Sequence, residues 1–264
     1  MPGVPGSSEG KGEMKVYAVV MRKGGTGKTT TAAHLAAGLA DKGRRVLIID
    51  LDPQSQQADL FGVPVEAGRS SREVLLEERP LVECMYDTRN LKLVPASRHW
   101  ENADVVMSGL NTGRVRLRLA LKTMVESVPA DALPEVVVID TPPNLGALTA
   151  NAIIAATDVL IPVEASQGAL MKLPETLETI RELKEGGLAP NVRIVGLLPT
   201  RVNLQTGHGV AVVEALRANP EQLRVFKPIH ERVRLKECFV RHTVSYDFDR
   251  DASGPYQDLV EALA

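Results

Sequence analysis

The sequence predicts an α/β fold in which a mostly parallel central sheet is flanked by helices on both faces. Apolar runs rich in β-branched residues alternate along the chain with longer helical stretches. These runs are continuously apolar, which is typical of strands that are buried on both faces of a parallel sheet. With 264 residues, of which 44% are hydrophobic and 24% charged, the chain can bury a sizeable core.

The first expected strand, 15–21, leads directly into a glycine-rich loop, and an alanine-rich helix follows that loop and ends at Gly43. Further strands are expected at 45–52, 91–97, 135–140, 158–164 and 192–200, and further helices at 102–127, 145–156, 169–185, 209–218 and 255–263. The polar region 62–90 predicts no clear element. No repeat or linker interrupts the pattern, so we expect one domain over 14–264, preceded by a disordered Gly-, Pro- and Ser-rich tail over 1–13.

The composition argues against several classes of protein. Aromatic residues make up 3% of the chain, which disfavours stacking platforms for single-stranded nucleic acid. The net charge of −2 gives no global attraction to DNA or lipid, so such binding would need a local patch. Cys84 and Cys238 form no paired motif, and no apolar run approaches the roughly 18 residues that span a bilayer.

The glycine-rich loop RKGGTGKTTT, residues 22–31, indicates a phosphate site. Small residues allow successive backbone N–H groups to surround a phosphate, and the following helix adds its positive N-terminal dipole. Lys28 is then expected to reach the β- and γ-phosphates, and the Thr29 hydroxyl to bind Mg²⁺. The general pattern has glycine at position 22, where this chain has Arg22, and a glycine-rich turn beside a lysine can also arise by chance.

The segment KGGTGKTT, 23–30, resembles the deviant Walker A motif of the ParA/MinD family of ATPases. The resemblance implies a dimer of two ATP-bound chains, with Lys23 of each chain reaching the phosphates of the other, as an arginine finger does. It implies ATP contacts from Lys23, Gly24, Gly25, Thr26, Gly27, Lys28, Thr29 and Thr30. The alternative for Lys23 is a solvated position at the rim of the loop.

Three acidic residues follow expected strands. Asp50 and Asp52 lie two apart at the end of the second strand, and Asp140 ends the apolar run 135–140. The carboxyl ends of parallel strands meet at one edge of a sheet, so these side chains are expected to share a crevice. The stretch from Asp50 resembles the family's switch I and the run ending at Asp140 its Walker B strand. The resemblance implies that Asp52 orients the attacking water and joins Lys23 and Lys28 as a catalytic residue. It also implies that Asp50, Asp140 and Thr29 form the binding site for Mg²⁺.

Looser similarities extend the resemblance over roughly 14–264. Residues 194–203 resemble the strand that ends at the base pocket, which makes Thr200 and Arg201 candidates for adenine contact. The segment 229–238 also resembles the family, but has His230 where the family has proline. In the segment 157–170 and just after it, Ser166 stands where the family often has an acid and Lys172 where it has glycine.

The ends and charges of the chain favour one branch of the family. From the acidic C-terminal residues we expect no basic amphipathic helix of the kind that membrane-binding members have, and from the short polar N-terminal stretch no helix-turn-helix domain like that of large plasmid members. The segment 193–241 contains nine basic and four acidic residues, a composition that suits non-specific DNA contact. Within this segment Arg217, Arg232 and Arg234 are the candidate DNA contacts, although a solvated face with scattered ion pairs is the alternative.

The resemblance therefore implies a small, Soj-type partitioning ATPase that uses ATP and Mg²⁺. We expect a homodimer in the ATP state, non-specific binding to double-stranded DNA, a ParB-like partner that stimulates slow hydrolysis, and no membrane association. The expected location is the cytoplasm, on the nucleoid. Three alternatives stay open: an ATPase of this fold that positions another cargo, a metabolic P-loop enzyme that uses ATP, and a nucleotide-gated scaffold that binds ATP but barely hydrolyses it.

Overall fold

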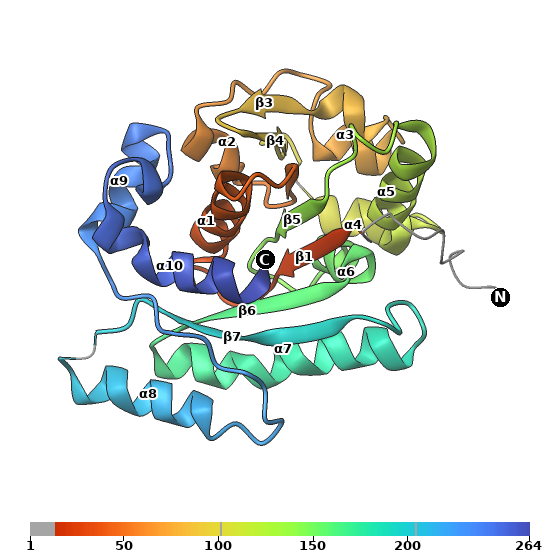
Figure 1. Ribbon diagram of the computed structural model, residues 1–264. Helices are drawn as coiled ribbons and strands as arrows, with labels where there is room; N and C mark the ends of the chain where they lie inside the picture. Colours follow the sequence, from red (N-terminus) through yellow and green to blue (C-terminus); the bar gives the residue numbers. More distant parts are fainter. Residues whose placement is uncertain (1–13, 101, 204) are drawn as a thin grey trace.

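A seven-stranded sheet runs through the computed structural model, which describes residues 14–100, 102–203 and 205–264 (Figure 1). The strand order is β3-β4-β2-β5-β1-β6-β7, and every neighbouring pair is parallel except β3 with β4. The predicted mostly parallel sheet is thus confirmed; the expected disordered tail, 1–13, lies outside the described residues. The strands are β1 Lys15–Val19, β2 Val46–Asp50, β3 Tyr86–Thr88, β4 Leu91–Val94, β5 Val136–Asp140, β6 Asp158–Glu164 and β7 Arg193–Thr200.

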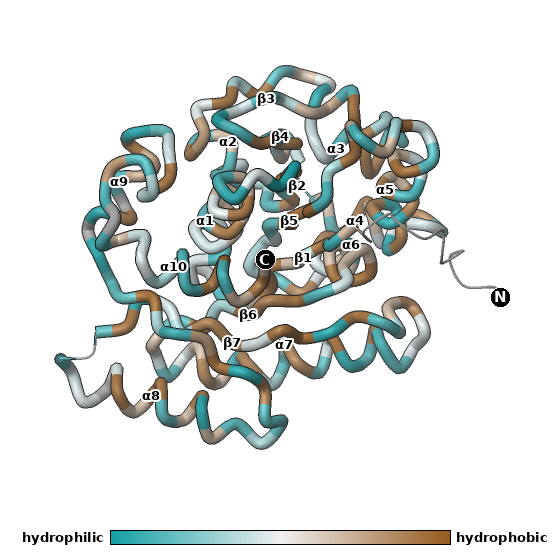
Figure 2. The backbone as a smooth tube through the Cα atoms, in the orientation of Figure 1, coloured by the Kyte–Doolittle hydropathy of each residue, from teal (hydrophilic) through white to brown (hydrophobic). Residues whose placement is uncertain are grey.

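Helices cover both faces of the sheet, as the sequence predicts. Ala18 and Ile49 belong to a hydrophobic cluster shared with α5, α6 and α7, whereas Val19 and Ile48 belong to another shared with α1 and α10. Neighbouring residues of one strand point to opposite faces, so every strand except the short β3 contributes to both clusters. Figure 2 shows the hydrophobic residues gathered along β6 and α6. The α-helices are α1 Lys28–Asp41, α2 Gln56–Phe61, α3 Ser71–Leu76, α4 Ala103–Gly109, α5 Arg116–Ser127, α6 Ala147–Ala155, α7 Gln167–Glu185, α8 Gly207–Arg217, α9 Val233–Arg241 and α10 Arg250–Leu263, and the 3₁₀ helices are η1 Leu81–Cys84, η2 Gly113–Val115 and η3 Ser245–Asp247.

The prediction of a single helix over 102–127 is wrong. The chain forms α4 and α5 instead, with η2 between them. Gly113 explains the break, because a Cβ atom at this position would lie 1.8 Å from the carbonyl oxygen of Met107. The close approach of two backbone segments there is possible only for glycine. The region 62–90, for which the sequence predicts no element, contains α3, η1 and the short antiparallel strand β3.

The parallel strands end at one edge of the sheet, and this edge positions the candidate site. β1 leads into the glycine-rich loop, β2 and β5 end in Asp50 and Asp140, and β6 and β7 end in Glu164 and Thr200. Ligands of open α/β sheets bind at this carboxyl edge.

Candidate active site

The loop between β1 and α1 has the backbone geometry of a phosphate-binding loop. Gly25 and Gly27 have φ values of 76° and 81°, in the left-handed region that glycine adopts without strain. Thr26 is fully buried, and its carbonyl oxygen accepts a 2.8 Å hydrogen bond from the Thr200 hydroxyl. The end of β7 therefore fixes the loop, and α1 begins at Lys28 with its N-terminal dipole at the site.

Lys28 points into the site from the first turn of α1. Its side chain is buried, and its Nζ donates a 3.1 Å hydrogen bond to the carbonyl oxygen of Lys23. Burial lowers the pKa of Lys28, while the nearby carboxylates of Asp140 and Asp52 act in the opposite direction. A lysine so placed is suited to bind phosphate oxygens.

Asp50 and Asp140 are cross-strand partners in the register of β2 and β5, and neither is accessible to solvent. Asp50 accepts hydrogen bonds from the backbone N–H groups of Asp52, at 2.9 Å, and of Gln57, at 3.2 Å. Burial, and then the charge of Asp140, raise the pKa of Asp50 well above its usual range. Burial raises the pKa of Asp140 to about 6, although hydrogen bonds from Gln57 and Thr29 oppose the shift.

These residues fit a magnesium ion. Asp140 Oδ1 is a buried oxygen without a hydrogen-bond partner among the described residues, and a second carboxylate and the Thr29 hydroxyl lie at the same site. No group of three His, Cys, Asp or Glu side chains placed to hold a metal occurs in the described ranges. Magnesium is commonly held by one or two carboxylates together with the phosphates of a nucleotide, which is the arrangement that Thr29, Asp50 and Asp140 allow.

Asp52 lies just beyond the end of β2, on the wall of the pocket next to the loop. The structure therefore places it in a turn and not within the strand as the expected range 45–52 implies. Burial raises the pKa of Asp52, while a 3.1 Å hydrogen bond from the backbone N–H of Gln54 and the charge of Lys28 lower it. A carboxylate with a raised pKa beside the phosphate loop is suited to accept a proton or to orient water.

Gln57 is a site residue that the sequence reasoning missed. It lies in the first turn of α2 and is fully buried. Its Nε2 donates to the carbonyl oxygen of Thr29, at 3.0 Å, and to Asp140 Oδ2, at 2.9 Å. Gln57 thus ties the P-loop helix to both strand-end carboxylates. No motif indicated it, because its role depends on contacts between distant segments.

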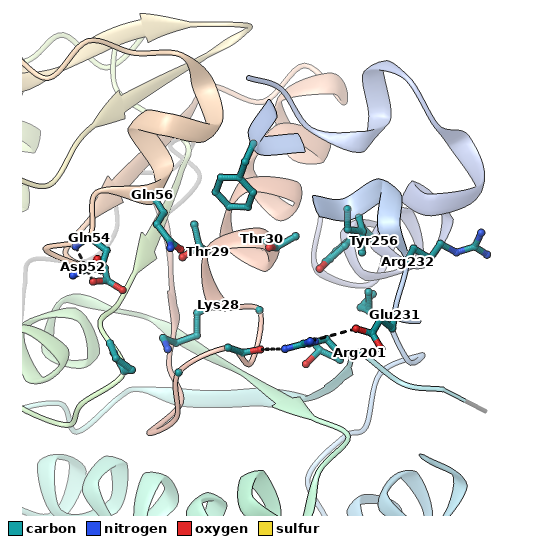
Figure 3. Close-up of a pocket in the computed structure, with 18 of the residues that line it drawn as sticks. Lys28, Thr29, Thr30, Asp52, Gln54, Gln56, Arg201, Glu231, Arg232 and Tyr256 are labelled. Atoms are coloured by element: carbon teal, nitrogen blue, oxygen red, sulfur yellow. Dashed lines mark hydrogen bonds and ion pairs between the residues drawn. The ribbon is translucent and has the colours of Figure 1, made fainter. Parts of the chain in front are cut away.

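The pocket beside the loop has a volume of about 520 Å³ and continues beyond the phosphate site. Figure 3 shows Asp52 and Gln54 at one end and Glu231, Arg232 and Tyr256 at the other. The far end also has apolar walls, which suit a nucleoside base, from Ile229, Leu235, Phe239 and Tyr256.

The structure brings Thr200 and Arg201, the predicted adenine contacts, to this pocket. The Thr200 hydroxyl is engaged with the loop carbonyl of Thr26, and Arg201 bridges the loop carbonyl of Gly25, at 3.4 Å, to Glu231, at 3.3 Å (Figure 3). Thr200 therefore fixes the loop, and Arg201 connects the loop to the far end of the pocket. The aromatic residues Phe239 and Tyr256 were missed, because only the fold brings the C-terminal segment to the loop.

Lys23 takes a different direction from Lys28. Its Nζ contacts the carboxylate of Glu164, which ends β6, and lies 3.2 Å from the Ser166 hydroxyl. The Lys23 side chain is 31% exposed and does not line the pocket. In a single chain the side chain of Lys23 thus lies at the rim of the loop, away from the phosphate site.

The three candidate DNA contacts lie on two helices. Arg232 and Arg234 flank the start of α9, whereas Arg217 ends α8, which Figure 1 shows well apart from α9. All three are exposed, but Arg232 also lines the nucleotide pocket, and Arg234 is hydrogen-bonded to Glu237 at 2.9 Å.

None of the helices in the described part of the chain has the length and hydrophobicity that a bilayer-spanning helix needs.

A glycine loop that leads into a helix, a buried lysine and paired carboxylates at strand ends define a P-loop nucleotide-binding protein. A family model described as an AAA domain (AAA_31) matches residues 14–194. The chain is 36% identical to the chromosome partitioning protein ParA of Myxococcus xanthus, over 94% of this chain and 87% of that protein. It is 31% identical to the sporulation initiation inhibitor protein Soj of Bacillus subtilis, over 95% and 98%. The chain therefore belongs to the ParA/MinD family of ATPases.

Solved structures agree with this assignment. The ATP complex of a McdA variant from Cyanothece has a TM-score of 0.86 and 28% identity, over 96% of this chain and 97% of that one. Cobyrinic acid a,c-diamide synthase from Mycobacterium smegmatis, solved with bound ADP and magnesium, has a TM-score of 0.80 and 30% identity, over 95% and 94%. Similar folds thus bind adenine nucleotides, in one case together with magnesium.

Proposed function

We propose that two copies of this chain, each with bound ATP and Mg²⁺, form a face-to-face dimer that binds double-stranded DNA without sequence preference. A ParB-like partner then stimulates the hydrolysis of ATP to ADP and phosphate, and the dimer separates into monomers. This cycle makes the chain a DNA-partitioning ATPase on the nucleoid in the cytoplasm.

The observation that carries the proposal is the different placement of two lysines on one loop. Lys28 is buried beside Asp52 and Asp140, where it is placed to bind the phosphates of its own chain. Lys23 lies at the rim and outside the pocket lining. A second cation held at the rim is suited to reach a nucleotide in a facing chain, which makes bound ATP a signal for dimer formation.

Within each chain the remaining groups have distinct roles. The backbone N–H groups of the glycine loop and Lys28 bind the phosphates, and Asp52 orients the attacking water. Thr29, Asp50 and Asp140 would hold Mg²⁺, which supplies positive charge to the phosphates when it is bound. Gln57 fixes the orientation of Asp140 through its 2.9 Å hydrogen bond.

DNA binding is proposed for the exposed arginines Arg217, Arg232 and Arg234. Each phosphate that such a side chain neutralises releases counterions, so affinity depends steeply on salt. A dimer presents two copies of every arginine and therefore binds far more tightly than one chain.

Co-sedimentation with a long DNA duplex tests this function. The protein is mixed with DNA in the presence of ATP, ADP or no nucleotide, each at a low and a high salt concentration. We expect binding with ATP only, and a strong loss of it at high salt. Equal binding in all three nucleotide states would contradict ATP-dependent dimer formation as its cause.

A metabolic enzyme that uses ATP is the second candidate, because cobyrinic acid a,c-diamide synthase is 30% identical over most of both chains. Such an enzyme would bind a second substrate next to the phosphates and has no need for DNA. Absence of DNA binding under every condition, together with ATP turnover that needs an added small molecule, would favour this candidate.

A further inference from the structure

Lys23 forms an ion pair with Glu164, the one carboxylate that it contacts among the described residues. Glu164 is the last residue of β6, and its side chain is 17% exposed. One carboxylate oxygen contacts Lys23 Nζ, and the other accepts a 3.1 Å hydrogen bond from Arg201. Glu164 therefore lies between two cations that both adjoin the phosphate loop.

The neighbours of Glu164 hold Lys23 against its own chain. The Ser166 hydroxyl lies 3.1 Å from Glu164 and 3.2 Å from Lys23 Nζ, and it also caps the first turn of α7. The aliphatic part of Lys23 passes over Gly168, where a Cβ atom would lie 3.6 Å from Lys23 Cε. The backbone of Lys23 is engaged as well, because its carbonyl oxygen accepts from Lys28.

The departure of Lys23 would not leave Glu164 without a cation. Arg201 remains hydrogen-bonded to Glu164 and is itself anchored to the Gly25 carbonyl oxygen and to Glu231. An unpaired charge in a partly buried position is costly, and the contact with Arg201 lowers that cost. The ion pair between Lys23 and Glu164 is therefore one that the protein can break and re-form.

We infer that Glu164 is a positioning residue that retains Lys23 in the single chain and thereby sets the threshold for dimer formation. The inference rests on the proposed function, in which Lys23 reaches the phosphates of a facing chain. Lys23 cannot contact Glu164 and those phosphates at once, so every dimer must first break two such ion pairs. Glu164 acts through Lys23 and does not line the nucleotide pocket.

Sedimentation velocity with a non-hydrolysable ATP analogue and Mg²⁺ tests the inference over a series of protein concentrations. The variant Glu164→Gln removes the charge but keeps the shape, and we expect its dimer to have a dissociation constant about three- to tenfold lower than that of the wild type. Glu164→Asp keeps the charge and should lie between the two, which also covers a folding defect of the first variant. Glu178→Gln, which removes an exposed carboxylate paired with Arg181 on α7, is the matched control and should leave the constant unchanged.

Two further measurements separate a role through Lys23 from a merely structural one. The difference between wild type and Glu164→Gln should shrink as ionic strength rises, because it is electrostatic. In a Lys23→Ala background, Glu164→Gln should have no effect on the oligomeric state. An unchanged or weaker dimer in Glu164→Gln, or a tighter dimer in the Lys23→Ala background as well, overturns the inference and leaves the proposed dimer intact. A wild type that stays monomeric at every concentration overturns the proposed function itself.

Discussion

Asp50 and Asp140 stand opposite each other at the ends of β2 and β5, and both carboxylates are fully buried. Two carboxylates at one buried site repel each other, and burial alone disfavours their charged forms. The charge of Lys28 stabilises the charged form of Asp140, but burial disfavours the charged form of Lys28 as well. A divalent cation bound at this site would offset the charge of both carboxylates.

Asp140→Asn should separate metal binding from folding. Asparagine can still accept the hydrogen bonds of Gln57 and Thr29, but it removes a buried charge whose pKa is raised to about 6. At pH 7.5 we expect the free energy of unfolding of the nucleotide-free protein to rise by on the order of 1–2 kcal/mol. Added Mg²⁺ should no longer increase the thermal stability of the ATP-bound form.

Chemical denaturation without nucleotide, and thermal denaturation with ATP in Mg²⁺ or in a chelator, measure these two effects. Asp131→Asn, which removes an exposed aspartate between α5 and β5, is the control. A variant that Mg²⁺ still stabilises as strongly as the wild type would exclude Asp140 from the metal site.

Lys28→Ala should severely weaken ATP binding. The side chain is buried at the start of α1, and it is a cation next to the carboxylates of Asp52 and Asp140. Without it the phosphates would meet two carboxylates and lose a charged hydrogen bond, so we expect affinity to fall on the order of 100-fold or more. Titration with a fluorescent ATP analogue measures the change. Lys42→Ala, at the exposed other end of α1, should bind as the wild type does, and similar affinities for both variants would contradict this role of Lys28.

All strands except β3 were predictable, because continuous apolar runs follow from burial on both faces of a parallel sheet. The expected run 135–140 differs from β5 by one residue, and 158–164 coincides with β6. The division of 102–127 into α4 and α5 was not predictable, because it depends on how closely Gly113 approaches the backbone of Met107. Periodicity in a single segment carries no information on such a tertiary contact.

The part of the site that was predictable lies next to the strands in sequence. The loop over 23–30, Asp50 and Asp140 follow apolar runs directly, and the shared sheet edge brings them together. Gln57, Glu164 and Tyr256 were not predicted as site residues, because each acquires its place from a segment far away in the chain. A lone Gln, Glu or Tyr gives no signal of this kind without a fold.

Asp52→Ala should slow ATP hydrolysis and prolong the life of the ATP-bound dimer. Asp52 lines the pocket next to the loop, and burial raises its pKa, which favours its action as a base. Loss of a general base commonly costs on the order of 100-fold or more in rate. Phosphate release and the lifetime of the dimer in ATP measure the two effects. Asp59→Asn on α2 is the control, and rapid turnover by Asp52→Ala would remove Asp52 from the mechanism.

The buried side chain of His34, on α1, should make the free energy of unfolding depend on pH. It is fully buried, and its Nε2 accepts a 3.1 Å hydrogen bond from the Ser245 backbone N–H. The ring proton is therefore on Nδ1, which donates to the carbonyl oxygen of Thr30 at 2.7 Å. Burial lowers the pKa of His34 to about 4, and the charges of Arg89 and Asp247 shift it in opposite directions.

The unfolded chain binds a proton at His34 below its ordinary pKa of about 6.5, whereas the folded chain does not until about pH 4. Stability from this group is therefore complete above pH 6.5 and falls as the pH decreases toward 4. Between pH 7.5 and pH 5 we expect His34 to remove about 2 kcal/mol from the free energy of unfolding. His34→Asn should lose this part of the pH dependence, although it will be less stable at pH 7.5 because the contact with Ser245 is lost. Denaturant titrations of both proteins at the two pH values test this. Equal slopes with pH, or an imidazole that titrates near 6.5 by NMR in the folded protein, would show that His34 is not held neutral by its surroundings.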